Sequence, residues 1–170
     1  QMLSLRPDLF VGLGEIGESP TEPLNYPPDD PIYVGDFEVA RAHEMVVYFH
    51  TGEGDHEAMD RALKMFPDLN FVVHADFVRP HIGDLMADNP NIYFTFNDIF
   101  EAIIPKFRFG DKQDFIDAME QEWEQLIDQG LDHYEDLINT YPDRFMWGTD
   151  RADIVWNYDV DIGQLLVRFG

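Results

Sequence analysis

Cysteine is absent from the 170 residues of this chain. Neither a disulfide framework nor a thiolate metal site can therefore form, and any metal ion must be held by histidine and carboxylate side chains. Long apolar runs are absent as well, because none approaches the roughly 20 residues that cross a bilayer. The first residues also do not have the basic segment and apolar region of a secretory signal. We expect a soluble protein with no membrane partner, and the cytoplasm is its default compartment.

Basic residues are scarce: 11 Lys and Arg stand against 34 Asp and Glu, which gives a formal net charge of −23 at pH 7. A chain with this charge repels phosphate groups, so nucleic acids and anionic membranes are excluded as partners. An excess of acid of this size resembles that of proteins from salt-rich habitats, where salt screens the repulsion. A merely acidic surface is the alternative. The hydrophobic content of 45% is that of a folded domain.

Apolar segments alternate with helix-like segments along the chain, which is typical of βα units around a parallel sheet. The apolar positions are consecutive, as in strands that are covered on both faces. The sequence predicts strands near 9–14, 45–50, 71–75, 91–96 and 145–149.

The segments between these strands predict three helices and one long loop. The first helix has Asp55 as its N-terminal cap and stops before Pro67. The second carries an apolar stripe from 115 to 127 and ends at Gly130. The third spans about 131–141. Residues 18–35 hold five prolines and are expected to form a long loop, which either shapes a substrate pocket or is only a rigid surface excursion.

Four of the apolar runs end on a polar group that could bind a metal ion: Glu15, His50, His74 and Asp150. In a parallel barrel the carboxyl ends of the strands share one mouth, where catalytic groups gather. Imidazole and carboxylate groups suit zinc and similar divalent ions. Each residue also has a structural alternative: a histidine can be hydrogen-bonded in the core, Asp150 can cap a turn, and Glu15 can pair with an arginine.

Further charged residues lie near these strand ends. Arg151, directly after Asp150, and Arg79 are candidates for binding a substrate carboxylate through a bidentate contact. The remaining histidines are expected on the surface: two in helical surroundings, one in a first helical turn and one in a loop, namely His43, His133, His56 and His81.

Five sequence pieces carry a resemblance to a known family: GLGEIG at 12–17, VVYFHTG at 46–52, FVVHA at 71–75, NIYF at 91–94 and PDRFMWGTD at 142–150. With these pieces the chain resembles the amidohydrolase superfamily, in particular the amidohydrolase-related metal-dependent hydrolases that include lactone hydrolases and nonoxidative decarboxylases. The resemblance implies an α/β fold, a partial (β/α)8 TIM barrel with strands four to eight. It also implies that His50 and His74 are metal ligands or carbonyl-polarising groups, that Asp150 is a ligand and proton shuttle, and that Glu15 is a less regular active-site carboxylate. A divalent metal ion is the implied cofactor, with zinc first.

The chain departs from this family in one respect: no His-x-His pair, which members carry on their first strand, occurs in it. A complete barrel has ~250 residues. We therefore expect residues 1–170 to be one domain without the first three βα units, with weak metal binding and no turnover when alone.

Three functions remain open at this stage. The first is metal-dependent hydrolysis of a small carboxylate-bearing amide, ester or lactone. The second is nonoxidative decarboxylation of an aromatic or conjugated acid, and the third is a non-catalytic half-barrel for binding or assembly. The expected partner is a small-molecule substrate, and a homo-oligomer is possible by resemblance.

Overall fold

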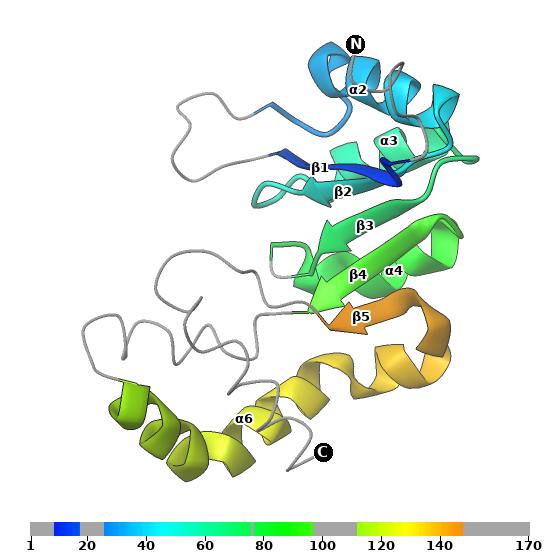
Figure 1. Ribbon diagram of the computed structural model, residues 1–170. Helices are drawn as coiled ribbons and strands as arrows, with labels where there is room; N and C mark the ends of the chain where they lie inside the picture. Colours follow the sequence, from blue (N-terminus) through cyan, green and yellow to red (C-terminus); the bar gives the residue numbers. More distant parts are fainter. Residues whose placement is uncertain (1–8, 18–25, 76, 97–111, 148–170) are drawn as a thin grey trace.

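A computed structural model describes residues 9–17, 26–75, 77–96 and 112–147. Its centre is one five-stranded sheet in which every neighbouring pair is parallel and the strands follow one another in chain order (Figure 1). The strands are β1 (Gly12–Gly17), β2 (Val46–His50), β3 (Phe71–His74), β4 (Ile92–Phe96) and β5 (Phe145–Trp147). This is the predicted α/β architecture, a consecutive run of parallel strands as in part of a TIM barrel.

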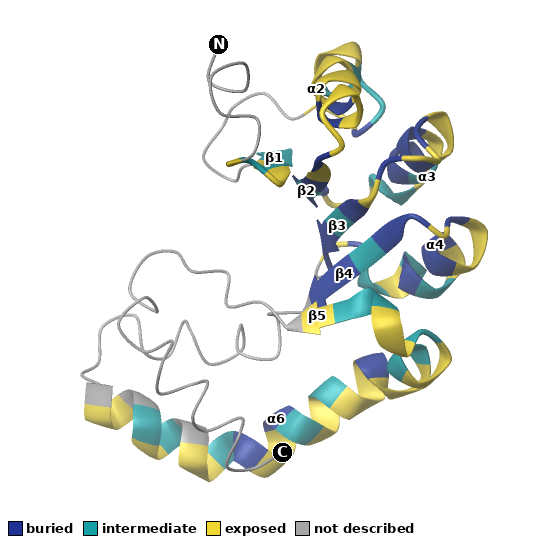
Figure 2. Cartoon of the chain, turned by 45° about the vertical axis from the view of Figure 1, so that its right-hand side comes forward, coloured by how far each residue is buried: buried dark blue, intermediate teal, exposed yellow. Residues whose placement is uncertain are grey.

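Helices connect consecutive strands, as a parallel sheet requires. They are α2 (Pro31–Ala42), α3 (His56–Met65), α4 (Ile82–Asp88) and α6 (Lys112–Thr140), with short 3-10 turns η1 (Arg79–His81) and η3 (Pro142–Arg144). Figure 2 shows α2, α3 and α4 side by side along one face of the sheet, with their buried residues turned toward the strands. No helix in the described part of the chain is long and apolar enough to cross a membrane.

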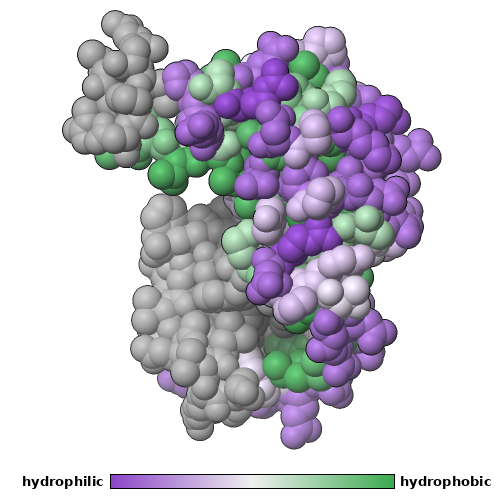
Figure 3. Space-filling view, turned by 90° about the vertical axis from the view of Figure 1, so that its right-hand side faces the viewer, coloured by the Kyte–Doolittle hydropathy of each residue, from purple (hydrophilic) through white to green (hydrophobic). Residues whose placement is uncertain are grey.

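The core lies between this helical layer and the sheet. Alternate strand residues point to one face, and the row Phe49, Val73 and Phe94 is almost fully buried there. Phe37 of α2 sits at the centre of this layer, and its ring makes edge-to-face contacts with three other phenylalanines, including Phe49 at 5.7 Å and Phe71 at 5.0 Å. The other residues of each strand face away from these helices. The outer surface of the described helices is largely hydrophilic (Figure 3), as the charge balance requires.

The helix predictions need three corrections. Gly130 does not end a helix: α6 continues through it, because the buried stripe of Trp123 and Leu126 resumes at Tyr134 with helical spacing. The loop predicted over 18–35 extends too far, because residues 31–35 belong to α2. Pro31 begins this helix, and the Asp30 side chain caps it by accepting a 2.9 Å hydrogen bond from the Ile32 amide. Asp55 precedes α3 as expected, but its side chain makes no capping bond.

Two further differences concern single elements. The first strand is β1 at residues 12–17 rather than 9–14, so Glu15 lies inside the strand and not after it. A helix that was not predicted, α4, follows η1, and His81 therefore lies at the junction of two helical turns instead of in a loop. The sequence does not predict the short α4 because its apolar residues, such as Leu85 and Met86, are too few to show a helical period.

Candidate metal centre

An irregularity in β1 places Glu15. The register runs Leu13 opposite Val47 and then Ile16 opposite Phe49, so three steps on β1 match two steps on β2. One extra residue on a strand is a β-bulge, which changes the direction of the side chains beside it. Leu13 and Ile16 both pack against the core. The bulge between them lets Glu15 reach the opposite face of the sheet.

Gly14 is the residue that makes this bulge possible. A Cβ atom built on it would come within 2.7 Å of the Tyr48 Cβ on the neighbouring strand and closer still to the Tyr48 carbonyl oxygen. Its φ of +149° is also one that residues with a side chain rarely adopt. Glycine is therefore required next to Glu15.

The two histidines end adjacent strands. His50 is the last residue of β2 and His74 the last residue of β3, and both follow the paired residues Phe49 and Val73. Their ring centroids lie 4.6 Å apart with an interplanar angle of 41°. One donor atom each from Glu15, His50 and His74 lies within 4.8 Å of the others. Within the described ranges this is the one group of three such donors, and it joins three of the four residues that the sequence singled out.

Hydrogen bonds tie the group together. His74 is 1% exposed, and its Nε2 atom lies 3.2 Å from the Glu15 Oε1 atom and 2.7 Å from the Tyr48 hydroxyl. Glu15 is about half-exposed. The hydrogen bond with His74 lowers the pKa of Glu15; partial burial opposes this, and the positive charge that His74 and His50 can carry adds to the lowering. Glu15 is thus held as a carboxylate, the form that binds a cation.

His50 has a different environment. Its Nδ1 atom is buried and has no hydrogen-bond partner among the described residues. The Phe77 ring, 43% exposed, lies 5.2 Å from the His50 ring and forms an apolar border of the group. A buried polar atom without a partner is costly unless a ligand satisfies it.

The other predicted site residues are not part of this group. Arg79 is a half-buried residue of η1, five positions after His74, and its contact with a substrate stays a prediction. Asp150 and Arg151 lie outside the described residues, so their roles also stay predictions.

Sequence reasoning missed Tyr48 and Thr95. The Tyr48 hydroxyl lies 3.3 Å from the Thr95 Oγ1 atom in addition to its bond with His74. A signal was present: Tyr48 is two residues before His50 in the same strand, and residues two apart share a face. Thr95 pairs directly with His74 in the register of β3 and β4.

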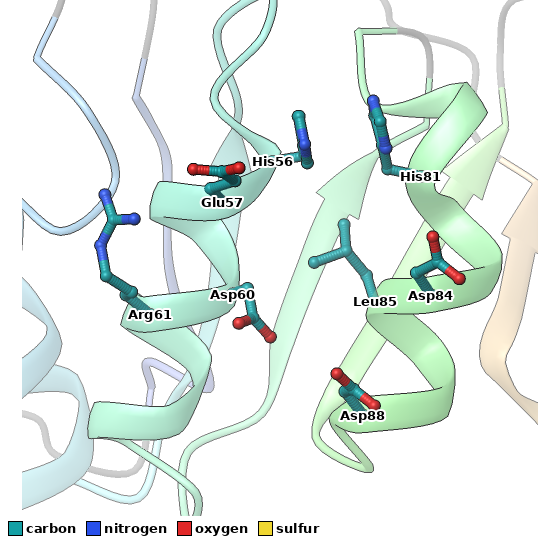
Figure 4. Close-up of a pocket in the computed structure, with 8 residues that line it drawn as sticks. All are labelled: His56, Glu57, Asp60, Arg61, His81, Asp84, Leu85 and Asp88. Carbon is teal, nitrogen blue, oxygen red and sulfur yellow. The ribbon is translucent and has the colours of Figure 1, made fainter.

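A hollow of about 390 Å³ lies between α3 and α4, away from this group (Figure 4). The rings of His56 and His81 stack there with centroids 3.5 Å apart and an angle of 5°. Four carboxylates border it as well, but they do not bring a third donor close to the two imidazoles in the described structure. Stacked parallel rings point their lone pairs side by side rather than toward one ion, so this hollow is not a second metal centre.

Comparison with known proteins supports the family resemblance. Searches of curated proteins and of solved structures returned no match. The model of one protein family, described as amidohydrolase, matches residues 10–168. This range includes all five strands and every candidate site residue. The chain therefore belongs to the amidohydrolase family.

Proposed function

We propose that this chain forms the metal-binding part of a hydrolase that acts on a small carboxylate-bearing amide, ester or lactone. The observation that carries the proposal is the convergence of Glu15, His50 and His74 at one edge of a parallel sheet, with donor atoms within 4.8 Å. This edge is where catalytic groups of barrel enzymes lie. Membership of the amidohydrolase family supports hydrolase-type chemistry in general.

The donor set fits a divalent cation. Two imidazoles and a carboxylate suit zinc, and they also accept manganese, iron or cobalt. The carboxylate has a lowered pKa, and the buried His50 Nδ1 atom has no partner within the described residues. When bound, such an ion polarises a substrate oxygen and makes water acidic enough to attack near neutral pH.

The candidate side chains have separate roles in metal binding, proton transfer and substrate binding. His50 and Glu15 are ligands, and His74 either binds the ion or polarises the substrate carbonyl. Asp150 is proposed as a further ligand that takes a proton from the attacking water. Arg151 and Arg79 are proposed to bind the substrate carboxylate through paired hydrogen bonds.

One feature favours a second reaction on the same residues. Phe77 offers an exposed aromatic face beside His50. A flat conjugated acid can stack on such a face, which suits nonoxidative decarboxylation of an aromatic or conjugated acid. Product analysis separates the two reactions, because release of carbon dioxide without a hydrolysis product excludes the hydrolase.

Isothermal titration calorimetry with zinc tests the metal centre. Replacing His50 with Gln is expected to weaken zinc binding roughly tenfold or more. His133→Gln is the matched control, because His133 is exposed on α6 and far along the chain from the three donors. Equal zinc affinity in the two variants would refute the proposed centre and favour a non-catalytic binding module.

A further inference from the structure

The stacked rings of His56 and His81 connect the starts of two helices, each of which follows a site histidine. His56 is the first residue of α3 and is reached from His50 through residues 51–55. His81 is the last residue of η1, directly before α4, on the segment that leaves His74. Figure 4 shows the two rings face to face at one end of the hollow. The stack therefore holds the start of α3 against the start of α4.

This stack accommodates uncharged rings better than two charged ones. The ring centroids are 3.5 Å apart, so two protonated imidazoles would place like charges in van der Waals contact. Among the described residues neither ring has an ion pair or a side-chain hydrogen bond, and the buried His56 Nδ1 atom has no partner there. His56 also occupies the first position of α3, where the helix dipole opposes a positive charge. The stacked arrangement therefore resists the second proton.

The charged groups around the hollow favour protonated rings only when the rings separate. Those that line it lie on α3 and α4, namely Glu57, Asp60, Arg61, Asp84 and Asp88. Next to the rings along the chain, Asp55 precedes α3 and Arg79 begins η1. Arg61 pairs with Asp29, and Lys64 lies 2.7 Å from Asp60 and 3.7 Å from Asp88. Asp84 has no ion pair within the described ranges, and it lies three residues after His81, a spacing at which helical side chains meet.

We propose that the His56–His81 stack is a pH-sensitive joint that is closed while at least one ring is uncharged and opens when both are protonated. On opening, His81 turns toward Asp84, and water reaches the His56 Nδ1 atom. The open form binds one proton more than the stacked form, so the stack is favoured at high pH and lost as pH falls. Opening releases the start of α3 from α4 and so loosens the segments that follow His50 and His74. This inference goes beyond the proposed function and needs no metal ion.

Proton NMR of the metal-free chain detects the stack. Each ring lies over the face of the other, so ring currents shift its proton signals upfield relative to those of the exposed His43. The signals are assigned by their loss in His56→Gln and His81→Gln. We expect the upfield shift at about pH 8 and its joint loss at about pH 5, the range in which histidines titrate. Absence of the shift at the higher pH, or its persistence at the lower one, would overturn the proposal.

Hydrogen exchange measures how far the joint loosens its surroundings. The Met59 amide donates to the Asp55 carbonyl at 2.9 Å in the first turn of α3, and the His81 amide donates to the Val78 carbonyl at 2.8 Å. After correction for intrinsic exchange rates, opening at both amides should rise by about tenfold for each pH unit by which the pH falls. The Phe71 amide, bonded to the Asn91 carbonyl within the sheet, is the internal control and should keep its protection. Equal pH dependence at all three amides would contradict a local joint.

His81→Phe separates the second proton from the contact between the rings. Phenylalanine keeps a flat ring over His56 but cannot be protonated, so the joint should stay closed at about pH 5. His56→Phe is the mirror variant and gives the same test from the other helix. Opening at low pH in a folded Phe variant, to the same extent as in wild type, would overturn the proposal. All of these measurements use the metal-free chain, so a failure of zinc binding refutes the proposed metal function and leaves this test intact.

Discussion

Replacement of Arg144 by Ala is expected to destabilise the fold markedly, although within the described part of the chain its contacts are with Asn89, Met86 and Tyr141 and not with Glu15, His50 or His74. Its guanidinium donates to the Asn89 carbonyl at 2.7 Å and to the Met86 carbonyl at 2.5 Å, at the carboxyl end of α4. It also lies over the Tyr141 ring, 4.6 Å from the centroid. The arginine thus joins the turn η3, which leads into β5, to the helix that precedes β4.

The size of the effect follows from these contacts. Hydrogen bonds that involve a charged group contribute about 1.5–3 kcal/mol each. The carbonyls freed by the substitution are partly buried, and water can recover some of the loss. A cation at a helix carboxyl end adds about 0.3–1 kcal/mol. We therefore expect a loss of about 2–3 kcal/mol, most of it from the two hydrogen bonds.

Thermal unfolding measures this loss. For a chain of this length 1 kcal/mol lowers Tm by roughly 2–4 °C, so Arg144→Ala should lower it by about 4–12 °C. Arg61→Ala is the control, because Arg61 pairs with Asp29 at 2.6 Å but is exposed. An exposed ion pair stabilises a fold little, because water screens both charges. Equal Tm values for the two variants would refute the reasoning that two carbonyl bonds at a helix end stabilise more than one surface ion pair.

Four other substitutions test the fold and the site. Asn91 is 5% exposed and donates to three main-chain carbonyls at and after the end of α3. Asn91→Ala should lower the free energy of unfolding by about 3 kcal/mol, because these carbonyls lose their donor. Urea unfolding measures this loss, and an unchanged midpoint would contradict the prediction. The pKa of Glu15 is lowered in the folded protein by its hydrogen bond with His74. The ionised Glu15 side chain therefore stabilises the fold fully at a pH above its pKa in the unfolded chain. This stabilisation is lost as the pH falls through the pKa of Glu15 in the folded protein. Carbon NMR should show Glu15 titrating at a lower pH in wild type than in His74→Gln. Gly14→Ala should speed amide hydrogen exchange throughout β1, because the added Cβ meets the neighbouring strand. Gly35→Ala should instead raise the free energy of unfolding by up to ~1 kcal/mol, because Gly35 lies in α2 with open space around it.

The central strands could be predicted because each is apolar on both faces. In β2 and β3 the residues toward the helices, such as Val47 and Val73, are fully buried, and those on the opposite face are half-buried or bind one another. Runs of this kind have no competing helical period, and a polar residue at the end marks where each one stops. His50 and His74 were found for that reason.

Elements whose form depends on partners far along the chain could not be predicted as well. Gly130 is a common signal for the end of a helix, but α6 runs through it because residues such as Leu126 and Tyr134 pack on the same side before and after it. Packing of an apolar face contributes more than the ~1 kcal/mol that glycine costs inside a helix. The prediction that a helix ends at Gly130 was wrong because tertiary contacts override this local signal.

Tyr48 and Thr95 show a similar limit at the site. Each is a strand-interior residue, and neither residue type suggests a metal site. Their importance arises from register, because the pairing of His74 with Thr95 and of Tyr48 with Val72 decides which hydroxyl reaches which ring. A sequence gives the faces of each strand but not the offset between strands.

The position of Glu15 depends both on the apolar pattern of its own strand and on the approach of the neighbouring strand. Leu13 and Ile16 are three residues apart, yet both are apolar residues that need the core. In a regular strand residues three apart face opposite sides, so a strand through this segment needs one extra residue between them. Gly14 is the residue there that tolerates the close approach of the next strand. The bulge must therefore fall at Gly14 and Glu15, which turns the carboxylate away from the core and toward His74.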